Sequence, residues 1–245
     1  GLGYRNLISI YLKLMDFREK WLKTLSEGKN IEPIHLVFVE EPEAHLHAQA
    51  QQVFVKKAFE ALCNNHVIKE HPWLKTQLVL STHSNHVVNE LDLNCMRYFR
   101  RVMDAGDKIP ISNVINLSST FGSDGETKQF VTRYIRLTHC DIFFADAVIL
   151  VEGPAEKILV PSFLTKADLD SYYISVIEVN GRHAHSFRSL IDKIGIPTLI
   201  VTDIDATETT IADDGKEKQV SVITAKGKGY KTGNPSVQNW LPGKV

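Results

Sequence analysis

Hydrophobic residues in the first hundred positions follow two spacings, one helical and one typical of short buried strands. Over residues 4–26, large apolar side chains recur every three or four positions, which predicts a long helix. Residues 44–62 and the segment "NHVVNEL" at 85–91 are also expected to be helical. The predicted strands are short apolar runs: "IHLVFV" at 34–39, "QLVLST" at 77–82 and "MRYFRRV" at 96–102.

A second region of the chain alternates strand and helix in strict order. The strands are expected at 147–151, 173–179 and 198–202, and the helices at 154–167 and 184–194. Such an order predicts a parallel sheet flanked by helices. Between the two regions, the polar segment 103–126 is expected to be a connection and 127–138 a helix. Residues 206–245 lose periodicity.

Composition limits the classes of protein to consider. The 245 residues are 43% hydrophobic and 23% charged, which allows two cores of roughly 100–150 residues each. The formal net charge of −1 excludes a global basic field, so binding of a nucleic acid would need a local basic patch or metal ions. Apolar runs fall short of the roughly 18 residues of a membrane span, and the cysteines lack zinc-ligand spacing. We therefore expect a reduced, cytoplasmic protein that does not enter a membrane.

Acidic residues close the first predicted strand. "LVFVEE" ends in Glu40 and Glu41, and ligands of an open parallel sheet bind beyond the carboxyl ends of its strands. One carboxylate there can hold Mg²⁺ while the other polarises a water aimed at a phosphate. "LVLSTHS" ends another strand near His83, whose imidazole is suited to contact a γ-phosphate. An exposed acidic turn that caps a helix is the structural alternative.

Acidic residues also close two strands of the second region. Glu152 ends "AVILV", and Glu156 lies four residues further on, in the first turn of the predicted helix. Asp203 and Asp205 end "TLIVTDID", and strand side chains two residues apart point the same way. The four carboxylates are expected to converge on one point, where Mg²⁺ or Mn²⁺ would offset their repulsion and a two-metal site would suit attack on a phosphodiester. A solvated helix start and an acidic loop are the alternative.

The first set of motifs resembles ABC-type ATPases of the RecF/SMC/OLD kind. "VFVEEPEAHLH" is similar to their Walker B motif and D-loop, "STHS" to their switch-histidine loop and "GLGYRNLI" to the tail of their signature motif. The resemblance implies that Glu40 is the Mg²⁺ carboxylate, Glu41 the catalytic base and His83 the γ-phosphate sensor. No G-x-x-x-x-G-K-[ST] loop occurs in the 245 residues and no methionine opens them. We therefore expect a fragment with half of an ATPase, the full-length protein binding ATP.

The second set of motifs resembles a Toprim domain of the OLD (overcoming lysogenisation defect) family. The likeness lies in "DIFFADAVILVEGPAEK" and in "VNGRHAHSFRSLIDKIGIPTLIVTDID". An ATPase followed by a Toprim domain is that family's arrangement. The resemblance implies that Glu152, Glu156, Asp203 and Asp205 are metal ligands, with Glu152 also in acid–base catalysis. A later acidic residue and a lysine of the family's site have no convincing match here.

The resemblance also implies a domain organisation and an activity. The fold is expected to be α/β, with the distal half of a RecF/SMC-like ATPase domain over 1–120, a connecting helix over 121–140 and a C-terminally truncated, Rossmann-like Toprim nuclease domain over 141–245. The implied activity is metal-dependent hydrolysis of DNA phosphodiesters, coupled to the ATPase and used in phage defence. The implied partners are DNA, further copies of the chain joined through the ATPase domain, and an accessory defence protein.

A basic stretch near the end of the chain is a candidate DNA contact. Lys226, Lys228 and Lys231 lie in an acid-free, glycine-containing segment that includes one aromatic residue, and lysines beside a metal site position DNA without reading its sequence. We expect 218–245 to be mobile without DNA; a solvated loop is the alternative. Two rival functions are other Toprim enzymes, a primase or a topoisomerase. Primases commonly carry a zinc module and topoisomerases need a nucleophilic tyrosine from another domain, and neither feature is visible in this sequence. An ATP-gated scaffold with an inactive Toprim domain is disfavoured by four intact carboxylates.

Overall fold

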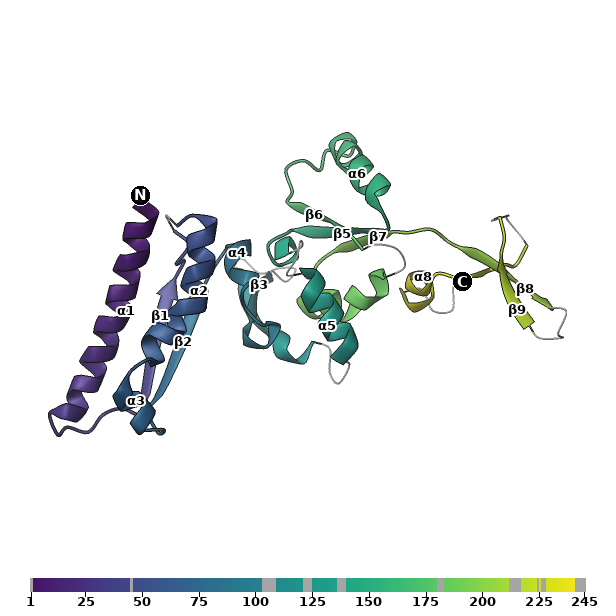
Figure 1. Cartoon of the computed structure of the whole chain (residues 1–245). Helices are drawn as coiled ribbons and strands as arrows, with labels where there is room; N and C mark the ends of the chain where they lie inside the picture. The colour runs from purple at the N-terminus through teal and green to yellow at the C-terminus, as the bar shows by residue number, and fades with distance from the viewer. Residues whose placement is uncertain are drawn as a thin grey trace. The chain divides into compact units, whose positions relative to one another are not determined.

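The computed structural model divides into two compact units, Gly1–Asp92 and Leu93–Val245 (Figure 1), which are treated separately below. The structure describes the chain except residues 1, 45, 103–108, 121–124, 136–139, 180–182, 212–216, 224, 226–227 and 241–245, and except the side chains of 2, 26 and 217. Residues 93–120, expected to belong to the first domain, cluster with the second unit. The expected domain boundaries stay a prediction. No helix among the described residues has the length and apolar character that a membrane span requires.

The first unit is a parallel strand pair packed against two helices. Its helices are α1 (Leu2–Ser26), α2 (Ala48–Cys63), α3 (His66–Glu70) and α4 (Asn85–Val88), and its strands are β1 (Ile34–Glu40) and β2 (Lys75–Ser81). The predicted long helix and both strands are confirmed. β1 and β2 run parallel with Glu40 opposite Ser81, so both strands end at the same edge.

One side of this strand pair forms the core of the first unit. Leu14 of α1, Val37 of β1 and Phe54 of α2 belong to one buried cluster. Alternate residues of a strand point to opposite faces, and on the other face Phe38 is 71% exposed. Burial of the α1 and α2 faces thus fixes the register of β1 and with it the position of Glu40 at the strand end.

The second unit begins with an antiparallel pair, β3 (Arg97–Val102) and β4 (Ile111–Asn116), followed by α5 (Gly125–Tyr134). β4 lies in the segment expected to be a connection, so that expectation was wrong in part. Its residues are exposed except Ile115, and without a buried face the strand has little period-2 hydrophobic signal.

The predicted parallel sheet is confirmed in the second unit. Its strands are β5 (Ala147–Val151), β6 (Ile174–Glu178) and β7 (Thr198–Val201), in the order β6-β5-β7. α6 (Pro154–Lys166) packs through Val160 on Ile149 and Val151 of β5. The next helix begins with a 3₁₀ turn and continues as α7 (Arg188–Ile194). The described 3₁₀ helices are Leu93–Cys95, Leu117–Ser119, Cys140–Phe143 and Ala184–Phe187.

Residues beyond β7 form regular structure that the sequence did not predict. β8 (Ala206–Ile211), β9 (Glu217–Ser221) and β10 (Lys231–Thr232) make an antiparallel sheet in the order β10-β8-β9, and α8 (Pro235–Trp240) follows. The described residues of 218–245 thus include regular structure, and the expectation that this stretch is mobile without DNA stays a prediction. β10 pairs with β8 at Ala206, directly after the acidic end of β7, which brings the chain back to that edge.

Candidate functional site

The acidic end of β1 faces the loop that follows β2. Glu41 has a φ of +42°, and its backbone amide donates to the Ser81 carbonyl at 3.0 Å. A positive φ at a non-glycine residue costs of order 1 kcal/mol and is common at functional sites. The Glu41 Oε1 atom lies 3.5 Å from Nε2 of His83, and both side chains are more than half exposed. The predicted pair of residues is therefore brought together, with Glu40 one position before it.

Glu43 links the two loops at this edge. Its Oε1 atom accepts one hydrogen bond from the Thr82 hydroxyl at 2.8 Å and another from the His83 amide at 2.7 Å. Thr82 Oγ1 in turn accepts from the Ser84 amide, and the Ser84 hydroxyl donates to Gln51. Glu43 was not among the predicted site residues, although it lies in the same acidic cluster. Its contact with residue 83 joins separate strand ends, and short-range spacing does not reveal such a contact.

The second acidic edge is built from the ends of β5 and β7. Oε2 of Glu152 accepts from the Thr202 hydroxyl at 2.6 Å and from the Asp203 amide at 2.9 Å. The strands are neighbours, with Val151 paired to Val201, so the residues that follow them lie side by side. The prediction that Glu152 and Asp203 come from adjacent strand ends is confirmed.

Glu156 has a structural task at the start of α6. Its Oε2 atom accepts from the Gly153 amide at 3.0 Å. This contact satisfies one of the amides that the first turn of a helix leaves without a partner, as in a capping box. Pro154 opens the helix, where the missing N–H of proline costs nothing. The side chain is thus turned toward the backbone between itself and Glu152.

The four predicted carboxylates do not form one cluster. Among the described residues, no three His, Cys, Asp or Glu side chains lie close enough to hold a metal ion together. The expected convergence is corrected for this reason: Glu152 is turned toward Thr202, and Glu156 is turned toward Gly153. Asp203 is exposed, and Asp205 has a φ of +49°. Their roles as metal ligands stay a prediction.

A segment late in the chain completes the edge, and the sequence analysis missed it. Asn234 is fully buried, and its Nδ2 atom donates to Thr202 Oγ1 and to the Asp203 carbonyl, both at 2.8 Å. The available signal was the "NPS" sequence, because asparagine before proline is typical of a turn that starts a helix. That signal places a turn but does not say which strand end it contacts.

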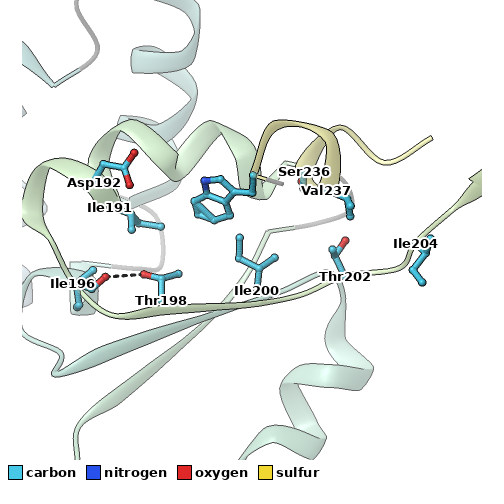
Figure 2. Close-up of a pocket in the computed structure, with 10 residues that line it drawn as sticks. Ile191, Asp192, Ile196, Thr198, Ile200, Thr202, Ile204, Ser236 and Val237 are labelled. Atoms are coloured by element: carbon cyan, nitrogen blue, oxygen red, sulfur yellow. Dashed lines mark hydrogen bonds between the residues drawn. The ribbon is translucent and has the colours of Figure 1, made fainter. Parts of the chain in front are cut away.

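An apolar cavity of about 640 Å³ adjoins Thr202 (Figure 2). Figure 2 shows Ile200 and Thr202 of the β7 segment below Ile191 of α7 and Val237 of α8. Thr198, Ile200 and Thr202 share a strand face by alternation. Thr202 thus lines the cavity, and its hydroxyl group also contacts the acidic edge.

The structure describes two of the three lysines predicted to contact DNA. Lys228 and Lys231 are exposed, and Lys231 lies in β10. Lys226 lies outside the described residues. His183 contacts Phe130, with 5.3 Å between the ring centroids, and lies 6.4 Å from His185.

Comparisons with known proteins agree with this division of the chain. A model described as "AAA ATPase domain" matches residues 1–88. A second model, described as "Overcoming lysogenization defect protein-like, TOPRIM domain", matches residues 143–205. The second match includes Glu152, Glu156, Asp203 and Asp205.

The curated relatives that the chain matches are named as nucleases. The chain is 31% identical over 245 residues to "Endonuclease GajA" of Bacillus cereus strain HuB5-5, which covers 95% of this chain and 34% of the relative. It is 27% identical over 184 residues to the protein of that name from strain VD045, covering 74% and 28%. It is 24% identical over 177 residues to "OLD nuclease" of Thermus scotoductus, covering 71% and 31%.

The chain spans about one third of the length of these relatives. Its two matched segments follow one another in the order that the motifs predicted, ATPase first and TOPRIM second. The resemblance inferred from those motifs is thereby confirmed: the chain is similar to OLD-family nucleases in its ATPase and TOPRIM segments.

Proposed function

We propose that this chain is part of a metal-dependent DNA endonuclease whose TOPRIM site is regulated by an ABC-type ATPase. One observation carries the nuclease half: Glu152 and Asp203, on neighbouring parallel strand ends, are joined by a 2.9 Å hydrogen bond inside the segment matched as TOPRIM. Parallel strands place ligands at this edge. The nuclease names of the relatives support the same activity.

The donor set fits a hard divalent cation. Carboxylate oxygens are the ligands that Mg²⁺ and Mn²⁺ prefer. The hydrogen bonds that hold Glu152 and Glu156 use Oε2 in each case. Among the described residues, Oε1 of each side chain therefore remains for a cation. Glu152, Glu156, Asp203 and Asp205 would hold the ion, which requires their side chains to turn from the separate positions described above toward one point. When bound, it would lower the pKa of a water and stabilise the leaving oxygen of a phosphodiester.

The chain's own residues have defined tasks in this proposal. Glu152, oriented by two donors, would present its other oxygen to the bound ion and take part in acid–base catalysis. Lys226, Lys228 and Lys231 would contact DNA phosphates and hold the strand without reading its sequence. Further copies of the chain, joined through the ATPase domain, and an accessory defence protein would be the partners, with phage defence as the setting.

Glu40, Glu41 and His83 would serve ATP in the full-length protein. Glu40 would hold Mg²⁺, Glu41 would polarise the attacking water and His83 would contact the γ-phosphate. The 3.5 Å separation of Glu41 and His83 supports a shared task. Because the 245 residues contain no phosphate-binding P-loop, we expect the chain alone to show negligible ATP turnover. Strong hydrolysis that Glu41→Gln abolishes would contradict this assignment.

Plasmid cleavage tests the nuclease half. The chain should nick supercoiled DNA with Mn²⁺ or Mg²⁺ and lose this activity in EDTA. Asp203→Ala should abolish cleavage, whereas Asp168→Ala, which changes an aspartate after the far end of α6, should not. DNA binding without cleavage under all metal conditions would favour the inactive scaffold, and cleavage by Asp203→Ala at the unchanged rate would refute the site.

A further inference from the structure

Asn234 is a buried amide whose hydrogen-bonding groups all have partners. Its side chain has no exposed surface. Nδ2 donates to Thr202 Oγ1 and to the Asp203 carbonyl, each at 2.8 Å, and Oδ1 accepts from the Ser236 amide at 2.9 Å. Burying an amide without such partners would cost several kcal/mol. Ser236 N–H can only donate, so the acceptor oxygen of Asn234 must face it and the NH₂ group must face Thr202.

The orientation of the amide sets the direction of the next hydrogen bond. A hydroxyl group has one hydrogen and two acceptor sites. Because Thr202 Oγ1 must accept from Asn234, its hydrogen is left for Glu152, whose Oε2 lies 2.6 Å away. Oε2 also receives the Asp203 amide hydrogen at 2.9 Å. Two donors therefore hold Oε2 of Glu152, and Oε1 remains the oxygen that could bind a metal ion.

We propose that Asn234 is a positioning residue of the TOPRIM site, which orients the Glu152 carboxylate through Thr202 and holds the backbone of Asp203 directly. The inference rests on the proposed metal-dependent function, in which both acids are ligands. Outer-shell partners of this kind fix the orientation of metal-binding side chains and typically change metal affinity by 10–100-fold when removed. Asn234 itself touches no reacting group in this role.

The segment around Asn234 is built to stay in this place. The amide of Asn234 donates to Thr232 Oγ1 at 3.0 Å, and the Thr232 hydroxyl donates to the Ile204 carbonyl. The Gly233 amide donates to the Asp205 carbonyl at 2.7 Å. A Cβ atom at residue 233 would lie 2.9 Å from Cγ2 of Thr207, so glycine permits this close approach. The acidic loop is thus held from several backbone positions.

A matched pair of substitutions at Thr202 separates positioning from packing. Thr202→Ser keeps the hydroxyl and removes the methyl group, whereas Thr202→Val keeps the shape and removes the hydroxyl. If the hydroxyl relays orientation, calorimetry should show a Kd for Mn²⁺ about 10–100-fold higher in Thr202→Val and within about threefold of the wild type in Thr202→Ser. Equal affinities for the two variants, or weaker binding by the serine variant, would overturn the proposal.

A second measurement needs neither metal nor cleavage. In the metal-free chain, both side-chain N–H groups of Asn234 should be protected from hydrogen exchange in NMR spectra of the wild type and of Thr202→Ser. In Thr202→Val one acceptor is lost, so exchange should be faster by about tenfold. Asn239→Ala, which removes an exposed amide of α8 that, among the described residues, donates only to the Pro235 carbonyl, should leave Mn²⁺ affinity unchanged.

The two measurements also separate this inference from the proposed function. If the Asn234 amide is protected as expected but the wild type binds no Mn²⁺, the metal-dependent function fails and the hydrogen-bond relay is supported. If Mn²⁺ binds but the Asn234 amide exchanges freely, or if Asn239→Ala weakens binding as much as Thr202→Val, the positioning role is refuted and the metal site remains.

Discussion

The backbone amide of His83 donates a 2.7 Å hydrogen bond to Oε1 of Glu43, although 40 residues separate them. The Thr82 hydroxyl donates to the same oxygen. The turn after β1 and the loop after β2 are therefore tied at the edge that carries Glu41 and His83. A displacement of either loop changes the separation of those two side chains.

Removing the Glu43 carboxylate should loosen this edge. Glu43→Ala leaves two donors without their acceptor and should lower the free energy of unfolding of the first unit by about 2 kcal/mol. Glu43→Gln retains an acceptor oxygen and should lose about half as much. Urea titration followed by Trp21 and Trp73 fluorescence measures the change. The control Glu60→Ala breaks an exposed ion pair with Lys57 and should cost about 0.5 kcal/mol or less; an equal loss in both would contradict the role of Glu43.

Glu156 should show separable effects on stability and on metal binding. Glu156→Gln can still accept from the Gly153 amide and should change stability by less than about 0.5 kcal/mol, whereas Glu156→Ala should cost about 1 kcal/mol through the lost cap. Both substitutions remove the charge and should weaken Mn²⁺ binding. Thermal unfolding and calorimetry on the same samples test this. Undiminished Mn²⁺ affinity in Glu156→Gln would show that the side chain only caps α6.

The exposed lysines near β10 should contribute to DNA affinity through phosphate contacts. Lys228→Ala combined with Lys231→Ala should weaken binding and reduce the slope of log K against log salt by up to about 0.9 per lost contact. Fluorescence anisotropy between about 50 and 200 mM salt measures the slope. Lys166→Ala combined with Lys193→Ala removes the same charge from the ends of α6 and α7. If both pairs change the slope equally, the effect is one of net charge.

His35 should make the first unit sensitive to acid. Its ring stacks on Trp21 at 4.8 Å, and burial lowers the pKa of its imidazole. The unfolded chain, with a pKa of about 6.5, therefore takes up the proton first as pH falls. Stability is fully retained above about pH 6.5 and decreases below it. Urea midpoints from pH 7.5 to 5 should fall less in His35→Phe, which keeps the ring stacking; identical slopes would exclude His35 as the cause.

The acidic strand ends could be predicted because they depend on local order. An apolar run followed by Glu40 or by Glu152 indicates a buried strand that ends at a carboxylate, and strand–helix alternation makes the strands parallel. Both strand ends are found where expected. The conformations of the carboxylates could not be predicted, because Glu156 and Glu152 accept hydrogen bonds from nearby donors and turn away from a common point.

The elements that the sequence did not predict lack a hydrophobic pattern or depend on contacts between distant residues. β8 carries "ATETTI", in which Ala206 is buried and the last four residues are exposed, so no alternation indicates a strand. Asn234 acts across 32 residues on Thr202. No spacing rule connects an asparagine before proline to a threonine in another strand end. Tertiary contact, rather than local propensity, decides both.

The order of the acidic residues and Asn234 along the chain has a consequence for biosynthesis. A ribosome adds Glu152, then Asp203, and only later the Asn234 that holds their loop. Since the exit tunnel of the ribosome encloses the newest part of a nascent chain, Glu152 and Asp203 emerge before Asn234 does. The acidic loop between β7 and β8 therefore reaches its final conformation only after residue 234 has left the tunnel.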